Sequence, residues 1–308
     1  MEKENSVLKN NNVIKIVLSI YTICFIFRIL EYFLLRTDET IIMEAIGHKI
    51  IGILILYISM KNLKISFRDI GFLGKNSFKN LLKGLAFGIS MFIIAYLTEI
   101  IIISMNGKFE GLKFYVTSYD VDKNIGYQTS VIFFIICILG NIVNVVMEEG
   151  IFRGLFTSIL YNKYKFIICA SITSTLFGLW HVVAPIRSFI DNDMSFYGMI
   201  ANIIMLVVTS TLVGFKFSLL TKMTGNLYMA IGDHFINNTI TNLLHVATNM
   251  GTDELMIIRL TIAQSLSCII VLIYYLTKYK KDNKIIERTK VKSNNSSVNI
   301  EKDSGHII

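Results

Sequence analysis

Apolar residues form long stretches in this chain, and short polar or charged segments separate them. A helix that crosses a bilayer needs about twenty apolar residues, and roughly eight stretches meet that length. The expected spans are residues 13–35, 41–60, 81–104, 129–160, 165–186, 197–221, 226–248 and 255–277. The fourth is longer than a perpendicular crossing needs, so we expect it either to tilt or to continue past the membrane interface, with a break near Gly154. The pattern predicts an all-α fold, a polytopic membrane helical bundle of about eight transmembrane helices.

Composition supports the membrane class. The chain has 308 residues, of which 53% are hydrophobic, and its mean hydropathy is +0.58. Its four cysteines lie singly within apolar stretches, without the spacing of a zinc site or a disulfide framework. The first apolar stretch is too long for the core of a signal peptide, so we expect it to remain as an anchor.

Basic residues concentrate on one side of the predicted bundle. Most Lys and Arg lie in the N-terminal segment, in residues 61–83, in the turns near 163 and 216–222, and in the C-terminal tail. Because positive charge favours the cytoplasmic side, we expect both termini in the cytoplasm. The formal charge of +8 is then explained by orientation and by contact with anionic headgroups of the lipid bilayer. We expect no nucleic-acid partner.

Two adjacent glutamates interrupt the fourth stretch, at Glu148 and Glu149. Glu149 and Arg153 are four residues apart, so they share a helix face in the orientation that favours an ion pair. Glu148 points elsewhere and continues a polar stripe that begins at Asn141 and Asn144. We infer that Glu148 is the reactive acid and Glu149 the structural one. Polar contacts that hold helices together are the alternative, but two acids and an arginine are costly in lipid.

Histidines interrupt two later stretches. His181 lies in the fifth, four residues after Phe177, and His234 lies in the seventh, four residues before Asn238. A single histidine in a bundle is more often a hydrogen-bonded core residue than a catalyst. The seventh stretch, however, carries a continuous polar stripe that needs a polar partner or water. Together with Glu148, these groups are suited to proton chemistry inside the membrane.

The motifs Glu148-Glu149-x-x-x-Arg153, Phe177-x-x-x-His181 and His234-x-x-x-Asn238 resemble the CAAX-protease and bacteriocin-processing family of intramembrane proteases (CPBP or Abi), which includes Rce1-like enzymes. They occur in the family's order, each on its own predicted helix. His245 also fits the third pattern with Asn249, but it lies near the end of a span, so we favour His234.

The predicted spans, the composition of the tail and the resemblance together divide the chain. The expected parts are N-terminal helices with a cytoplasmic segment (1–128), the protease core (129–248), a last transmembrane helix (249–277) and a disordered cytoplasmic tail (278–308). Residues 61–80 mix apolar and basic side chains, which suits an amphipathic segment on the membrane interface or an ordinary loop. We expect an integral protein of a bacterial plasma membrane.

The resemblance also implies a reaction, the hydrolysis of peptide bonds in membrane-associated proteins or peptides. Glu148 would activate water, and His181 would orient the water or pass its proton to the leaving amine. His234 and Asn238 would donate to the oxyanion, with Glu149 and Arg153 as structural support.

Three alternatives concern the metal and the function. We expect no cofactor, but Glu148, His181 and His234 are also a ligand set for zinc. A non-catalytic bacteriocin-immunity or membrane scaffold protein would retain the helical framework of the family without its catalytic activity. A proton-coupled transporter would use the same acid and histidines, although the paired interrupted helices of many transporters are not evident.

Overall fold

The computed structural model describes residues 12–40, 42, 44–117 and 127–279, and within them the chain is mainly helical. The predicted all-α membrane bundle is confirmed. Six helical stretches are long and apolar enough to cross a membrane: Val13–Glu39, Ser77–Met105, Val131–Tyr161, Phe166–Ile190, Phe196–Thr224 and Met256–Tyr279. Residues 280–308 of the predicted tail and both predicted cytoplasmic termini lie outside the described residues, whereas the first two tail residues end a helical segment, Tyr275–Tyr279.

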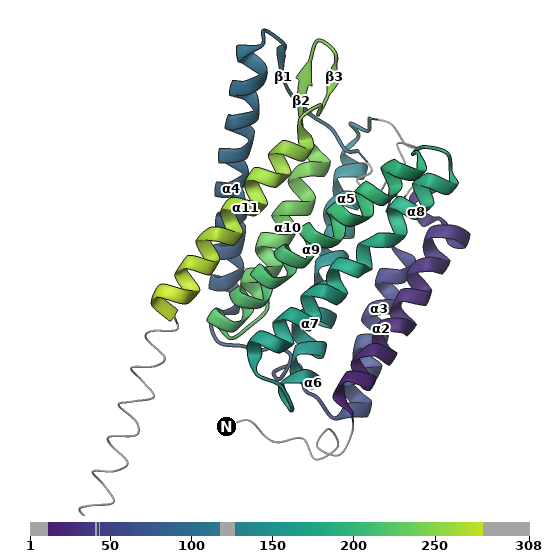
Figure 1. Ribbon diagram of the computed structural model, residues 1–308, viewed down its shortest axis with the longest axis vertical. Coiled ribbons are helices and arrows are strands. Elements are labelled where there is room, and N and C mark those ends of the chain that lie inside the picture. Colours follow the sequence, from purple (N-terminus) through teal and green to yellow (C-terminus); the bar gives the residue numbers. More distant parts are fainter. Residues whose placement is uncertain (1–11, 41, 43, 118–126, 280–308) are drawn as a thin grey trace, which may run out of the picture. The chain divides into compact units, whose positions relative to one another are not determined.

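The α-helices follow the predicted spans closely. Their bounds are α2 Val13–Leu30, α3 Gly47–Leu63, α4 Ser77–Met105, α5 Val131–Glu148, α6 Thr157–Tyr161, α7 Phe166–Leu179, α8 Val183–Ile190, α9 Phe196–Thr224, α10 Tyr228–Leu243 and α11 Met256–Tyr274 (Figure 1). Helices α3 and α10 have only 17 and 16 residues. The count of eight crossings therefore stays a prediction, while the helical bundle is established.

The fourth predicted span does not break near Gly154. Instead α5 passes into a π-helical segment, Glu149–Phe156, which continues into α6. A π-helical turn widens the helix and changes the direction in which successive side chains point, and such turns are frequent at functional sites. The wider turn begins at the second glutamate, so Glu148 and Glu149 both lie in the interior.

The predicted helix 226–248 is wrong at its C-terminal end. Helix α10 stops at Leu243, and β2 (Leu244–Thr248) pairs antiparallel with β1 (Phe109–Phe114) and with β3 (Gly251–Thr252). The strand forms because its backbone is paired on both sides and His245 bonds to Asp253 and to the carbonyl of Tyr115. These partners are distant in sequence, so apolar length alone predicted a continuing helix.

Residues 64–76 form turns rather than an amphipathic helix, so the loop alternative for this segment is correct. The loop nevertheless packs inward: Ile70 is buried, and Gly71 accepts a backbone hydrogen bond from Leu227. It therefore joins the start of α4 to the start of α10.

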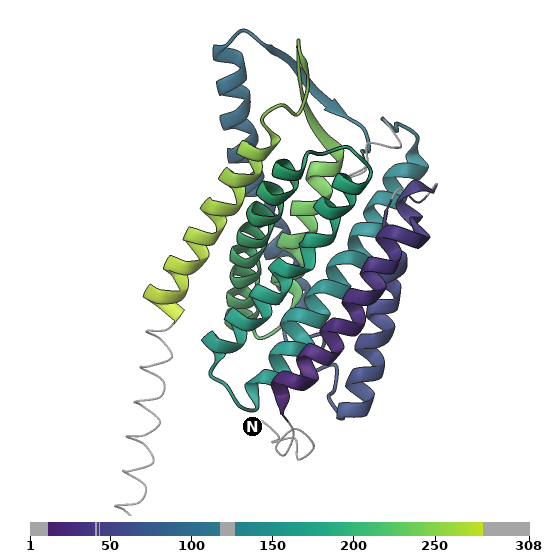
Figure 2. The ribbon, with the colours of Figure 1, turned by 45° about the vertical axis from the view of Figure 1, so that its right-hand side comes forward.

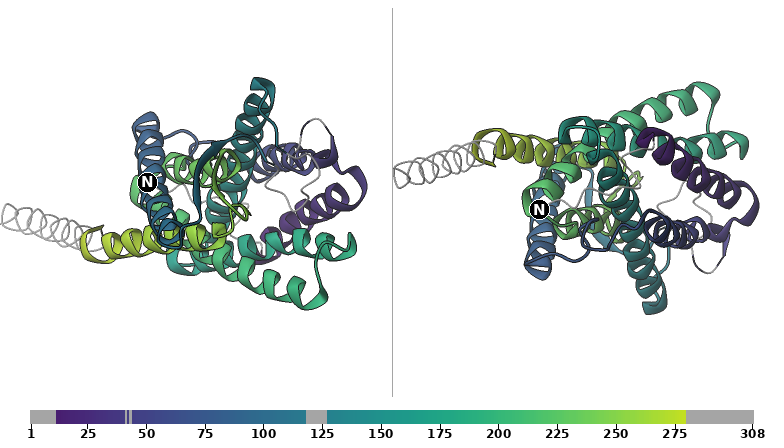
Figure 3. Two further views of the ribbon diagram at one scale, coloured as in Figure 1. Left: turned by 90° about the horizontal axis from the view of Figure 1, so that it is seen from above. Right: turned by 90° about the horizontal axis from the view of Figure 1, so that it is seen from below.

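Helix α10 packs against α4, α5 and α9 in the interior of the bundle (Figures 1, 2 and 3). Its contact with α4 is close because both helices carry glycines there. A side chain at Gly84 would meet the backbone carbonyl of Met229, and one at Gly232 would meet that of Leu81. Small residues allow helix backbones in membranes to approach closely. Residues Ile269–Ile308 form a separate unit, of which the structure describes the helical part 269–279.

Candidate active site

Glu148 is the last residue of α5, and its carboxylate is buried. Oε1 accepts a hydrogen bond from the indole Nε1 of Trp180 at 3.1 Å, and Oε2 accepts one from Nδ2 of Asn144 at 3.4 Å. The contact with Asn144 follows the polar stripe expected from the sequence. Sequence reasoning missed Trp180, although it is the chain's only tryptophan and directly precedes His181.

Glu149 forms the expected ion pair with Arg153, with 3.4 Å between Oε1 and Nη1 and both side chains fully buried. The guanidinium also lies over the ring of Phe177, at 4.0 Å from its centroid. The same oxygen of Glu149, however, faces Nδ1 of His234 at 2.9 Å. Glu149 is therefore part of the histidine cluster as well as the partner of Arg153.

His234 lies between the two glutamates. Its Nδ1 faces Glu149, and its Nε2 lies 3.5 Å from Oε2 of Glu148. The ring of Phe217 stacks on the imidazole at 4.8 Å between centroids. An ionised carboxylate can only accept hydrogen bonds, so Nδ1 of His234 carries a proton and Nε2 is the atom directed at Glu148.

His181 lies in the short 3-10 turn Trp180–Val182, between α7 and α8. Its Nδ1 is 2.8 Å from the carbonyl oxygen of Phe177. A carbonyl only accepts, so Nδ1 donates and, in the neutral ring, Nε2 keeps its lone pair. His181 is close enough to Glu148 for an electrostatic interaction between them. The turn therefore leaves one basic nitrogen of His181 available near the carboxylate.

Two buried cations from the N-terminal helices, Arg28 and Lys49, also act electrostatically on Glu148. The guanidinium of Arg28 bonds to Nε2 of His48 at 2.9 Å and lies 4.8 Å from the ring centroid of Trp180. Lys49 also forms an ion pair with Glu44. Only the packing of α2 and α3 brings the two cations near enough to act on the glutamate cluster.

Asn238 lies one turn after His234 on α10, but the structure does not bring its amide into contact with the cluster. Within the described chain its side chain forms no hydrogen bond with Glu148, His181 or His234, and its Oδ1 accepts one from Nδ2 of Asn237 at 3.0 Å. The competing histidine, His245, lies in β2 and not among the glutamates.

The residues named as a zinc ligand set have other partners in this structure. Nδ1 of His234 faces Glu149, and Oε1 of Glu148 accepts a hydrogen bond from Trp180. Among the described residues no group of three or more His, Cys, Asp and Glu side chains is placed to hold a metal ion.

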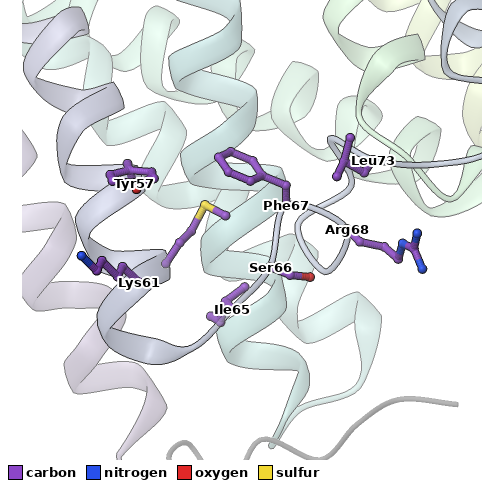
Figure 4. Close-up of a pocket in the computed structure, with 8 residues that line it drawn as sticks. Tyr57, Lys61, Ile65, Ser66, Phe67, Arg68 and Leu73 are labelled. Carbon is purple, nitrogen blue, oxygen red and sulfur yellow. The ribbon is translucent and has the colours of Figure 1, made fainter.

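A separate cavity lies where α3 ends and the loop to α4 begins (Figure 4). Its volume is about 570 Å³. The ring of Phe67 points from the loop toward the side of Tyr57, and the charged ends of Lys61 and Arg68 point in different directions. Its lining residues are Tyr57, Met60, Lys61, Ile65, Ser66, Phe67, Arg68 and Leu73. None belongs to the glutamate and histidine cluster, so the cavity is separate from the candidate active site.

Comparison with known families finds a match over part of the chain. Residues 130–240, about a third of the sequence, match the family described as Rce1-like, type II CAAX prenyl endopeptidase. Over this segment the chain is similar to Rce1-like proteins. This Rce1-like segment contains Glu148, His181, His234 and Asn238, whereas Arg28 and Lys49 lie outside it. No curated protein matches the chain.

The similarity over this segment supports a CAAX-type membrane protease, and the six long apolar helices support an integral membrane protein.

Proposed function

We propose that this protein is an intramembrane endopeptidase that hydrolyses peptide bonds of membrane-associated proteins or peptides with a water activated by Glu148. The observation that carries the proposal is the buried cluster of Glu148, Glu149 and His234 with His181 beside it. Four such groups are costly to hold in a membrane protein's interior, and a proteolytic site explains all of them together.

The first step is attack by water on the scissile carbonyl carbon. Glu148 takes one proton from the water as the new C–O bond forms, and the carbonyl oxygen becomes an oxyanion. Trp180 donates to Oε1 of Glu148 at 3.1 Å, whereas the contact of Asn144 with Oε2 is longer, at 3.4 Å, so we assign the proton to Oε2. The lone pair on Nε2 of His181 orients the water by accepting a hydrogen bond from it.

The second step breaks the C–N bond. The proton held by Glu148 passes to the leaving nitrogen, directly or through Nε2 of His181, and the products are a carboxylic acid and an amine. His181 suits this transfer because Phe177 keeps its ring oriented through Nδ1.

Oxyanion stabilisation is assigned to His234 and Asn238. Glu149 holds Nδ1 of His234, so the ring turns Nε2 toward Glu148 and the reacting carbonyl. When Nε2 is protonated it donates to the oxyanion, and the amide of Asn238 supplies the second donor. Loss of one such donor in other enzymes costs about 10²–10³ in kcat.

Replacement of Glu148 by Gln tests the proposal, because it keeps the shape and removes the base. The matched control is Glu99→Gln, at another fully buried carboxylate that does not belong to the cluster. Oε2 of Glu99 pairs with Nη1 of Arg259 at 2.8 Å. Membranes with equal amounts of each variant receive an internally quenched, farnesylated CAAX peptide. We expect cleavage by wild type and by Glu99→Gln but not by Glu148→Gln. Equal cleavage by Glu148→Gln and wild type overturns the role of Glu148.

A further inference from the structure

A partly buried chain of polar side chains leads from α9 through α11 to the proposed oxyanion donor on α10. It starts at Lys216, whose ammonium lies 2.7 Å from Asp233 and 3.0 Å from Oε1 of Gln264. Nε2 of Gln264 donates to Oδ1 of Asn237 at 2.6 Å, and Nδ2 of Asn237 donates to Oδ1 of Asn238 at 3.0 Å.

The direction of every hydrogen bond in this chain follows from the lysine. An ammonium group can only donate, so Gln264 must present its oxygen to Lys216 and its NH₂ group to Asn237. Asn237 must then accept through its oxygen, which leaves its own NH₂ group for Asn238. The oxygen of Asn238 is thereby used, and its free hydrogen-bonding group is the NH₂.

We propose that Lys216, Gln264 and Asn237 are positioning residues that set the amide orientation of Asn238, so that a donor rather than an acceptor meets the oxyanion. The inference rests on the proposed function, in which Asn238 stabilises the oxyanion. An unrestrained asparagine amide is free to turn over, and its oxygen would then repel the developing negative charge.

Lys216, which begins this row of hydrogen bonds, is itself held firmly. Lys216 and Asp233 are both buried, and the third donor of the ammonium is used by Oγ of Ser267 at 3.1 Å. Asp233 directly precedes His234, so the ion pair also holds the turn of α10 that carries the histidine. Gln264 lies outside the segment that matches the Rce1-like family. Helix α11 therefore has a part in the site that the family match does not cover.

Replacing Gln264 by Glu reverses the chain of donors. A carboxylate accepts from Lys216 and also presents an oxygen to Asn237, which must turn to donate. Asn238 must then turn as well, and its oxygen faces the reacting carbonyl. We expect kcat on the farnesylated CAAX peptide to fall by about 10² or more with KM unchanged. Gln264→Met frees the amides without reversing them, and kcat should fall about tenfold.

Ser267→Ala is the matched control, because Ser267 accepts from the same ammonium on the same helix but does not lead to Asn238. Its kcat should stay near that of wild type. In an Asn238→Ala background, Gln264→Glu should cause no further loss. Two results overturn the proposed positioning role. One is a double variant whose loss of kcat is the product of the two single losses. The other is an equal kcat for Gln264→Glu and Ser267→Ala.

The controls separate this inference from the proposed function. Wild-type kcat in Asn238→Ala refutes the oxyanion role itself, whereas a low kcat there together with a normal kcat in Gln264→Glu refutes only the positioning role. A readout independent of turnover is the ¹H–¹⁵N spectrum of asparagine-labelled protein in detergent. Gln264→Glu should shift the side-chain signals of Asn237 and Asn238, and Ser267→Ala should not. Unchanged Asn238 signals in Gln264→Glu also overturn the positioning role.

Discussion

Replacement of Glu149 tests the proposed site sharply, because one of its two carboxylate oxygens contacts two partners. Oε1 contacts both Nδ1 of His234 and the guanidinium of Arg153, while Oε2 has no hydrogen-bond partner. In Glu149→Gln the amide oxygen can keep both contacts, and the NH₂ group takes the place of the unpartnered oxygen. The substitution therefore removes the charge while nearly preserving the shape.

Two separate losses should follow. Arg153 becomes a buried charge without its partner, which typically costs about 3–5 kcal/mol of unfolding free energy. His234 loses the carboxylate that orients its ring, and neutralising such a carboxylate behind a catalytic histidine lowers kcat by up to about 10⁴ in the serine proteases. We expect at least about a hundredfold loss of kcat here, because His234 is assigned to the oxyanion rather than to the base.

Arg153→Met separates the two effects. It removes the ion pair but leaves the bond between Glu149 and His234, so it should lower stability to a similar degree while kcat stays within about tenfold of wild type. Unfolding in detergent by increasing SDS measures stability, and hydrolysis of the quenched peptide measures kcat. If both variants lose equal stability and keep equal kcat, Glu149 acts only as structural support, as the sequence alone suggested.

Four further outcomes follow from the same structure. Trp180→Phe removes the indole donor of Glu148, and a hydrogen bond to a charged group is worth about 1.5–3 kcal/mol, so kcat should fall at least about tenfold in the peptide assay. Gly84→Ala forces a methyl group against the carbonyl of Met229 and should cost about 1–3 kcal/mol in SDS unfolding, whereas exposed Ser90→Ala on the same helix should be nearly neutral. Burial alone would raise the pKa of Asp253, but hydrogen bonds from His245 and from the N–H of Val246 and the charge of Arg259 hold it below its usual value. The resulting stability of the β2–β3 hairpin is complete above the unfolded pKa of about 4 and is lost as the pH falls through the lowered pKa. Hydrogen exchange at β2, corrected for intrinsic rates, should therefore rise in acid for wild type, while Asp253→Asn should exchange faster at neutral pH and show little further change. Chelator treatment should leave kcat unchanged, and activity restored only by stoichiometric zinc would contradict the metal-free mechanism.

The helices were predictable because the length of each apolar stretch, and the ionisable residues within it, can be read from neighbouring positions in the sequence. Glu149 and Arg153 pair as their four-residue spacing implied. The second role of Glu149 was not predictable, because it depends on the π-helical turn and on the approach of α10. Spacing along one helix says nothing about contacts between helices.

The other contacts that the sequence did not predict were missed for the same physical reason. Trp180 reaches Glu148 across 32 residues of sequence, and Arg28 reaches His48 from a different helix. The strand at His245 forms through pairing with residues more than a hundred positions earlier. Such contacts leave no periodic signal in the chain. A charge within an apolar span, such as Arg28, is a signal that a polar partner lies elsewhere in the bundle, and here that partner is His48.

The central claim is that Glu148 supplies the base for peptide hydrolysis. Its most direct test is the kcat of purified Glu148→Gln in detergent on the quenched farnesylated peptide, beside wild type and Glu99→Gln. General-base catalysis contributes about 10²–10⁴, so the variant should lose about 10³ in kcat while Glu99→Gln stays near wild type. A Glu148→Gln kcat within a few-fold of wild type would contradict the account.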